Sequence, residues 1–219
     1  VCAAKGFKAN GIQCGLAHAG AHVTKKKNDL AVILADNECT AAAVYTTNKV
    51  KGAPILVTKE HLKNGKARAV IVNSVNANTC NADGVEKASK MCSLVSAELG
   101  IDENDVIVAS TGVIGQVLPI EPIEKGMKSL CEGLSYEGNK AALEAIMTTD
   151  TQPKEVAVQF EIGGKICTMG GMLKGSGMIH PNMATTLTFI TTDADISAEL
   201  LQRALSDIVK ITLNRVSVD

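Results

Sequence analysis

The chain has 219 residues, of which 46% are hydrophobic and 21% are charged. It is long enough to bury a sizeable core and has the composition of an ordinary globular protein. With a formal net charge of −1, 2% aromatic residues and no tryptophan, it has neither the basic face nor the stacking platforms that would favour a nucleic-acid partner.

The first third of the chain alternates short apolar runs with turn residues. Four runs have the length and β-branched content of buried strands: Leu30–Leu34, Ala41–Tyr45, Ile55–Thr58 and Ala69–Val75. An amphipathic helix is predicted after Asp83-Gly84, because apolar residues recur at spacings of three and four as far as Leu99. Gly100 is a suitable C-cap for that helix.

The middle of the chain contains the clearest local prediction. A short strand over Val106–Ala109 leads into Ser110-Thr111-Gly112, and a second helix is predicted within Asn139–Met147. From Val156 to Met169 we expect a β-hairpin, since apolar and polar residues alternate before Gly163-Gly164. This glycine pair supplies the positive φ of a two-residue turn.

The last part of the chain predicts one more strand and one more helix. Thr185–Thr192 is rich in threonine, a good strand former. Ser197 can cap a final helix whose apolar face extends from Leu201 to Leu213. Because strands and helices follow one another without a regular βαβ rhythm, without repeats and without an evident linker, the sequence predicts layers of the α+β class.

The segment Lys174–Thr186, KGSGMIHPNMATT, is the most informative for function. A threonine hydroxyl is a weak nucleophile unless a base lies beside it, and the threonine's own free α-amine is one such base. A chain break between Ala184 and Thr185 would create that pair. The segment therefore suggests a self-cleaving acyl transferase, against the alternative that Thr185 is one ordinary strand threonine among several.

Two neighbouring motifs allow a functional and a structural interpretation. Lys174 either holds a substrate carboxylate or is an exposed loop lysine. The turn over residues 110–115, STGVIG, either holds an oxyanion through a backbone N–H and the Thr111 hydroxyl or is only a turn. The glycines from Gly170 to Gly177 match no phosphate-binding motif, so we interpret them as turns and close backbone approaches.

Histidines and cysteines do not form a recognisable site. His18 and His22 have the spacing of helical metal ligands but no third ligand, and His61 and His180 belong to no triad, so we expect no metal. Seven cysteines without CxxC spacing are typical of a reducing compartment. No apolar run approaches the roughly 18 residues of a membrane helix. The default prediction is a cytoplasmic protein without a membrane contact, although the missing initiator Met leaves a removed leader open.

Taken together, these motifs resemble the ornithine acetyltransferases, also called glutamate N-acetyltransferases, the bifunctional ArgJ-type proteins of arginine biosynthesis. KGSGMIHPNMATT resembles the autoprocessing signature of that family. The stretch from Gly6 to Val57 with its Asn10-Gly11 turn, and the segments NSVNANTCNADG, STGVIG and MTTDTQPK, are also similar, although Val75 stands where glycine is usual. The resemblance covers nearly the whole chain.

The resemblance implies a fold and a set of site residues. The fold would be the layered α/β/β/α sandwich of these self-processing proteins. Residues 1–184 would be the α subunit and residues 185–219 the beginning of a β subunit, with the two pairing as α2β2. Cleavage between Ala184 and Thr185 would make Thr185 the nucleophile. Thr111 and Gly112 would form the oxyanion hole, and the substrate would be bound by Thr148, Lys174 and Thr185.

The reaction implied by the resemblance moves an acetyl group from N2-acetyl-L-ornithine to L-glutamate through an acetyl-threonine, without a cofactor. Whether acetyl-CoA also serves as an acyl donor depends on details of the pocket that the sequence leaves open. An N-terminal-nucleophile amidase or aminopeptidase of related fold is the alternative enzyme. A binding or assembly protein without catalysis is the remaining alternative.

Overall fold

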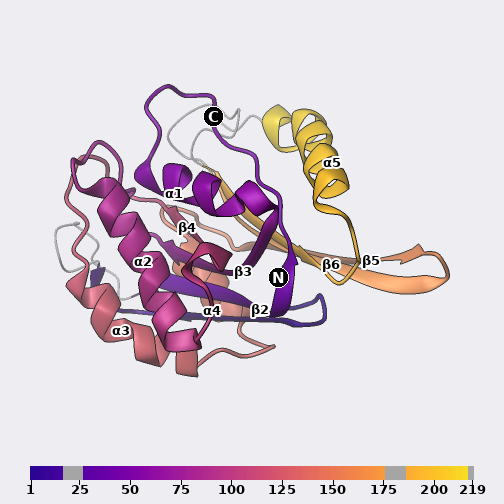
Figure 1. The fold of residues 1–219 in the computed structure, drawn as a ribbon, viewed down its shortest axis with the longest axis horizontal. Helices are drawn as coiled ribbons and strands as arrows, with labels where there is room; N and C mark the ends of the chain where they lie inside the picture. The colour runs from indigo at the N-terminus through magenta and orange to yellow at the C-terminus, as the bar shows by residue number, and fades with distance from the viewer. Residues whose placement is uncertain (17–26, 176–185, 217–219) are drawn as a thin grey trace.

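The computed structural model describes residues 1–16, 27–175 and 186–216. Its helices and strands form layers around two β-sheets (Figure 1). One sheet has the strand order β1-β2-β3-β4 and the other β5-β6-β7. The expected α+β class with a layered arrangement is therefore confirmed.

The larger sheet contains one parallel pair of strands. Its members are β1 (Phe7–Ile12), β2 (Leu30–Thr40), β3 (Lys66–Asn73) and β4 (Val106–Ser110). The first three strands are antiparallel, and β3 and β4 are parallel. A parallel pair needs a crossover connection, which here contains α2 (Gly84–Leu99). The carboxyl ends of β3 and β4 consequently meet at one edge of the sheet.

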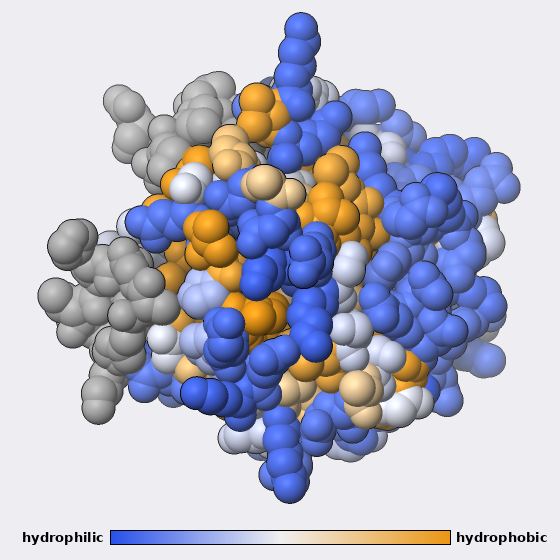
Figure 2. Space-filling view, turned by 60° about the vertical axis from the view of Figure 1, so that its left-hand side comes forward, coloured by the Kyte–Doolittle hydropathy of each residue, from blue (hydrophilic) through white to orange (hydrophobic). Residues whose placement is uncertain are grey.

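Three helices cover one face of this sheet: α1 (Ala53–His61), α2 and α3 (Glu121–Glu132). The core between helices and sheet is aliphatic, as the near absence of aromatic residues requires, and includes Leu30, Val32, Ile71, Met91 and Ile123. The face of the molecule in Figure 2, which brings the left-hand side of Figure 1 forward, is mostly hydrophilic, with hydrophobic side chains in a few patches.

The opposite face of the sheet contacts α4 (Asn139–Ile146) and the smaller sheet. That sheet consists of β5 (Lys154–Ile162), β6 (Lys165–Lys174) and β7 (Leu187–Thr192), all antiparallel. A second core lies here, with Ala9, Ile33, Val72, Leu143 and Met172 among its members. The last helix, α5 (Ala198–Ile211), lies beside the segment that follows β2, where the Gln202 amide bonds both backbone groups of Ala43.

Several local predictions are confirmed at the level of single residues. Gly100 ends α2 in the left-handed conformation with φ of 64°, and its N–H bonds the carbonyl of Ser96. Gly163 and Gly164 join β5 and β6 with φ of 57° and 74°, the positive values of a type I′ turn. The Ser197 hydroxyl caps α5 by accepting from the Leu200 N–H. The strands predicted at Leu30–Leu34 and Val106–Ala109 lie within β2 and β4, and the one predicted at Ala69–Val75 overlaps β3, which ends at Asn73. The helix predicted within Asn139–Met147 is present.

Other local predictions are wrong. Ile55–Thr58 lies in α1, because a four-residue apolar run does not distinguish strand from helix and Pro54 suits a first helical turn. Ala41–Tyr45 is not a strand; after Thr40 the chain leaves the sheet and is held instead by Gln202. Asn10-Gly11 is not a turn but part of β1.

The sequence did not predict β1 or α3, and the structure gives a reason for each. In β1, a Cβ at Gly11 would lie 2.1 Å from the Ala141 carbonyl, so this glycine allows α4 to approach the strand. In α3, the apolar stripe of Ile123, Met127 and Leu130 is diluted by charged residues. Predicted strand Thr185–Thr192 is confirmed from Leu187 onward, while Thr185 lies outside the described residues.

Candidate active site

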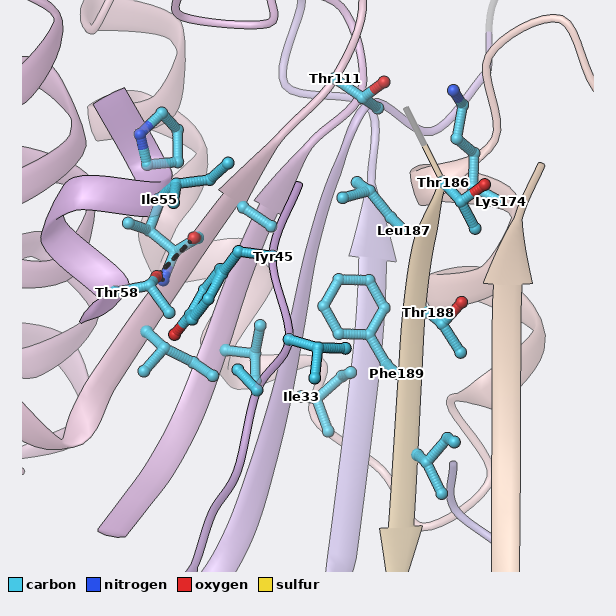
Figure 3. A pocket seen from close by; sticks show the side chains of 18 of the residues that line it. Ile33, Tyr45, Ile55, Thr58, Thr111, Lys174, Thr186, Leu187, Thr188 and Phe189 are labelled. Carbon is cyan, nitrogen blue, oxygen red and sulfur yellow. Dashed lines mark hydrogen bonds between the residues drawn. The ribbon is translucent and has the colours of Figure 1, made fainter. Parts of the chain in front are cut away.

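A cavity of about 1760 Å³ lies between the two sheets. Most of its lining is apolar, from residues such as Ile33, Leu187 and Phe189. Thr111 stands on one side of one end of this cavity, and Lys174 and Thr186 stand on the other side (Figure 3). We call this polar end the candidate active site.

Thr111 and Gly112 directly follow β4 at the carboxyl end of the parallel pair. The Thr111 N–H continues the ladder by donating to the Asn73 carbonyl at 3.0 Å, and its side chain is 7% exposed. Within the described part of the chain, no hydrogen bond uses the Thr111 hydroxyl or the Gly112 N–H. Two donors beside a cavity are the parts from which an oxyanion hole is made.

Gly112 occupies a position that other residues cannot adopt without distortion. Its φ is +126°, and a Cβ there would lie 2.1 Å from the carbonyl oxygen of Val75. The contact exists because the chain after β3 and the chain after β4 stay paired, with the Val113 N–H donating to the same Val75 carbonyl at 2.9 Å. Glycine is therefore required here by both conformation and space.

The asparagine-rich segment forms the rigid support of this turn. The Asn73 carboxamide oxygen accepts from the N–H groups of Val75 and Asn76 at 3.3 and 3.0 Å, and its nitrogen donates to the Ser110 hydroxyl at 2.7 Å. Asn76 in turn donates to the Gln116 carbonyl at 3.0 Å. Such Asx interactions replace a regular ladder after a strand ends. They give the asparagines of this segment a structural role, which the sequence alone did not indicate.

Lys174 is the last residue of β6 and is only 5% exposed. The interpretation as an exposed loop lysine is therefore wrong. Burial lowers the pKa of its ammonium, an effect that the charge of Asp150 opposes. A buried ammonium beside a cavity can bind a carboxylate strongly, because the surroundings screen the charges less than water does.

The loop after α4 brings Thr148 and Asp150 to the same cavity. Asp150 accepts from Lys154 at 2.7 Å, from the Gly175 N–H at 3.0 Å and from the Thr148 N–H at 3.3 Å. Burial alone would raise the pKa of this carboxyl, but the hydrogen bonds lower it below its usual value. Asp150 thus ties the loop of Thr148 to the end of β6. Sequence reasoning quoted the motif MTTDT but missed this link, which appears only once the loop and the strand are adjacent.

Lys27 and Asp29 were also missed by sequence reasoning. Asp29 is fully buried and accepts from the N–H groups of Cys14 and Gly15 at 2.7 and 3.2 Å. Lys27 lines the cavity and donates to the Met147 carbonyl at the end of α4. Burial lowers the pKa of Lys27, against the nearby charge of Asp29. A KxD pair before a strand offers little signal in a chain with many lysines.

The remaining candidates divide into structural residues and residues outside the described part. His61 is structural, with Nδ1 2.6 Å from the Val106 carbonyl. Gly170 and Gly171 lie within β6, so they form no turn; at Gly170 the strand closely approaches Val1. The residues outside the described part are Ala184, Thr185, Gly177, His18, His22 and His180.

In residues 1–16, 27–175 and 186–216, no group of three or more His, Cys, Asp or Glu side chains could hold a metal ion. No helix among them is long and apolar enough to cross a membrane.

Comparison with known proteins assigns the chain to a family. A model of the ArgJ family matches residues 13–219. The chain belongs to the ArgJ family. A curated relative, the arginine biosynthesis bifunctional protein ArgJ of Caldanaerobacter subterraneus, is 46% identical over 216 residues, covering 98% of this chain and 52% of the relative. The chain thus spans about half the length of the curated ArgJ proteins it matches.

Solved structures of ArgJ proteins have the same fold. The crystal structure of an ArgJ protein from Bacillus halodurans matches with a TM-score of 0.76 and 44% identity, covering 84% of this chain and 94% of that one. Ornithine acetyltransferase from Mycobacterium tuberculosis, solved with ornithine, matches with a TM-score of 0.72 and 33% identity, over 83% of this chain and 94% of that one. An aminopeptidase and esterase/amidase from Ochrobactrum anthropi, at 14% identity and a TM-score of 0.57, shares the fold alone.

Proposed function

We propose that this ArgJ-family chain is part of a self-cleaving glutamate N-acetyltransferase that moves the acetyl group of N2-acetyl-L-ornithine to L-glutamate through an acetyl-threonine. One observation carries the proposal. Thr111, Gly112 and Lys174 line one cavity, which is also lined by Thr186, the residue directly after Thr185 in the chain. Two donors for an oxyanion and a cation for a carboxylate are what acyl transfer between amino acids needs.

In the proposed self-cleavage, the Thr185 hydroxyl attacks the carbonyl carbon of Ala184. The peptide C–N bond breaks as the ester C–O bond forms, and the hydroxyl proton passes to the Thr185 nitrogen. Water then hydrolyses the ester, which leaves a carboxylate on Ala184 and a free α-amine and hydroxyl on Thr185. Residues 1–184 become the α subunit, and residues 185–219 begin the β subunit.

The extent of a solved relative supports this division. The Bacillus halodurans chain pairs with 84% of the present chain over nearly its whole length. The curated relatives, in contrast, continue far beyond the matched part, which is 52% of the Caldanaerobacter protein. A polypeptide divided near residue 184 would yield a separate chain of about the solved extent.

In the proposed acetyl transfer, the free α-amine of Thr185 acts as the general base. An α-amine has a pKa of roughly 8, close enough to neutral pH to take the hydroxyl proton. The hydroxyl oxygen attacks the acetyl carbonyl, and the ammonium returns its proton to the leaving amine of ornithine. The amine of glutamate then attacks the acetyl ester and releases Thr185.

The described residues supply binding and charge stabilisation in this scheme. The Thr111 hydroxyl and the Gly112 N–H hold the oxyanion of each tetrahedral intermediate, a contribution of about 2.7–4 kcal/mol per donor in other acyl-transfer enzymes. Lys174 binds a substrate carboxylate, and Thr148 binds the substrate beside it. This reaction needs no cofactor, and acetyl-CoA is a further acyl donor to be tested for the same site.

We also propose that a β subunit packs on this chain at the cavity. At about 1760 Å³ the cavity exceeds the roughly 300–1,000 Å³ of ordinary small-molecule sites. Both β4 and β7 are edge strands of their sheets in the described part, and both line the cavity. Further strands of the same protein would complete these edges. A cytoplasmic α2β2 assembly, as the family resemblance implies, is the quaternary form that we propose.

The decisive experiment is Thr185→Ala in the protein as its gene encodes it. Intact mass spectrometry should show one uncleaved polypeptide, and no ornithine should be released from N-acetylornithine. The neighbouring Thr186→Ala, which keeps Thr185, should still be cleaved. Normal cleavage of Thr185→Ala would overturn the nucleophile assignment.

A second assay separates transfer from hydrolysis. The wild-type protein is incubated with N-acetylornithine, with and without glutamate, and both ornithine and acetylglutamate are measured. Transfer requires glutamate for continued turnover and yields acetylglutamate. Release of ornithine that does not depend on glutamate would instead indicate an N-terminal-nucleophile amidase.

A further inference from the structure

Ser74, the residue directly after β3, has a buried hydroxyl without a hydrogen-bond partner in the described part of the chain. The residue is 3% exposed, and its side-chain oxygen bonds no group of residues 1–16, 27–175 or 186–216. Buried hydroxyls in folded proteins are nearly always paired. The backbone of Ser74 is satisfied, since its N–H donates to the Asp29 carbonyl at 3.0 Å. Only the side chain therefore needs an explanation.

The register of the sheet places this hydroxyl next to Thr111. Asn73 pairs with Ser110 in the parallel ladder, and Asn76 pairs with Val113 farther along with the same offset. Ser74 and Thr111 are consequently neighbours on adjacent strands, which lie about 4.8 Å apart. Direct neighbours project from the same face of a sheet, and both residues line the cavity.

The polar groups around Ser74 are engaged elsewhere. The Asn73 carboxamide bonds the N–H groups of Val75 and Asn76 and the Ser110 hydroxyl. The Asp29 carboxylate accepts from the backbone of Cys14 and Gly15. Ser74 is therefore not a member of the network that supports the Thr111 turn, although it lies in the middle of it.

We infer that Ser74 donates a hydrogen bond to an oxygen atom of the bound substrate, beside the oxyanion position of Thr111 and Gly112. The inference rests on the proposed function, in which the substrate is an N-acetyl amino acid. Such a substrate carries an acetyl carbonyl oxygen and a carboxylate, and a serine hydroxyl can donate to either. The bound substrate then supplies the partner that the hydroxyl lacks among the described residues.

A merely structural serine and a substrate-binding serine respond differently to Ser74→Ala. Removing a hydroxyl that has no partner among the described residues breaks no hydrogen bond to them, so the Tm should stay equal or rise. If the hydroxyl binds substrate, kcat/KM for N-acetylornithine should fall at least tenfold in the same variant. The inference thus predicts lower activity without lower stability.

The experiment uses the protein as its gene encodes it, with cleavage followed by intact mass spectrometry and kinetics measured at saturating glutamate. Ser74→Cys introduces a side chain of similar size that is a weak donor, so its kcat/KM should fall as in Ser74→Ala. Ser74→Thr keeps a hydroxyl and should recover part of the activity. If Ser74→Ala lowers kcat relative to wild type, Ser74 donates to the acetyl oxygen. If it raises KM instead, Ser74 donates to the substrate carboxylate. Failure of Ser74→Ala to cleave itself at unchanged Tm would support the same role, because the proposed self-cleavage also forms an oxyanion, on the carbonyl of Ala184.

Thr188→Val is the matched control. Thr188 also has a buried hydroxyl without a hydrogen-bond partner among the described residues, and it lines the same cavity. It lies in β7 of the smaller sheet, however, and is not a ladder neighbour of Thr111, so kcat/KM should change much less than in Ser74→Ala. Unchanged kcat and KM in Ser74→Ala, or a Tm lower by several degrees, would overturn the inference. Absence of transfer by the wild-type protein would overturn the proposed function instead.

Discussion

The two faces of the four-stranded sheet differ in what this chain does with them. On the helix side, side chains of β2, β3 and β4 pack against α1, α2 and α3, and Leu30, Val32 and Ile71 are fully buried. On the other side, α4 and β6 cover only part of the sheet, and the rest borders the cavity. The same strands serve both sides because successive residues project from opposite faces.

This difference suggests that one side of the sheet contributes mainly to stability and the other mainly to the proposed catalysis. On the helix side, α1, α2 and α3 cover the sheet, so substitutions there should lower the free energy of unfolding and leave kcat unchanged. The cavity side ends in Ser74, Thr111 and Lys174, so substitutions there should affect catalysis and cost little stability. Substitutions on either side can test whether the two faces differ in this way.

The largest expected effect is on stability, for Met91→Ala. Met91 is fully buried between α2 and the sheet, and truncating such a side chain leaves a void that costs about 2–5 kcal/mol. Denaturant unfolding measures the loss, and kcat of the folded variant should remain near that of wild type. As a control, Ile166→Ala, at a residue 73% exposed, should change the free energy of unfolding by less than about 0.5 kcal/mol. A large loss of kcat in folded Met91→Ala would contradict this difference between the two faces.

Gly112→Ala should have the next largest effect. The added Cβ would collide with the Val75 carbonyl, so the turn must shift, and the proposed oxyanion donors would move with it. We expect kcat to fall by about 10²–10³-fold, as for loss of one oxyanion-hole donor. Gly115→Ala is the matched control, since Gly115 has φ of +77° but nothing within 4 Å of the added atom. If both variants lose activity equally, backbone strain and not the donor position is responsible.

Lys174→Met should weaken substrate binding. A hydrogen bond to a charged group is worth about 1.5–3 kcal/mol, so KM for N-acetylornithine should rise by about 10–150-fold. Because burial disfavours the charged form of Lys174, the Tm should not fall. Lys165→Met, at the exposed start of β6, should leave KM unchanged. A lower Tm with unchanged KM would make Lys174 a structural residue.

The smallest effect concerns pH and Asp150. Its pKa is lowered in the folded protein because hydrogen bonds outweigh burial. Such a carboxylate contributes its full stability above its unfolded pKa of about 3.9, and the contribution is lost as the pH falls through the lowered folded pKa. The difference in unfolding free energy between wild type and Asp150→Asn should be constant near neutral pH and shrink below about pH 4. A difference that persists undiminished at acidic pH would contradict this assignment.

Local signals predicted those elements whose geometry depends on near neighbours in the chain. The positive φ of Gly100, Gly163 and Gly164 and the cap at Ser197 follow from the chemistry of single residues. Ile55–Thr58 was mistaken for a strand because four apolar residues have no resolvable period, and its packing against α2 and β4 decides for helix. β1 was missed because Asn10-Gly11 imitates a turn, and contact with α4 overrides that preference.

The candidate site divides in the same way. Residue types and the resemblance to ornithine acetyltransferases singled out Thr111, Gly112, Thr148 and Lys174, and the structure brings all four to one cavity. Asp150, Asp29 and Ser74 carried no comparable signal, because their importance comes from partners distant in the chain. Thr185, the residue on which the proposed chemistry depends, stays a prediction from the sequence.

The sequence by itself determined the family and the α+β class and singled out the candidate residues for the proposed acyl transfer, since all of these depend on residue type and local spacing. Only the tertiary structure decided that Lys174 is buried and that Gly112 admits no Cβ. It also decided that the Ser74 hydroxyl lies beside Thr111 without a hydrogen-bond partner among the residues that the structure describes. These properties arise where β3, β4, β6 and the loop after α4 converge, and no local pattern encodes the distance between segments that meet only in the folded chain.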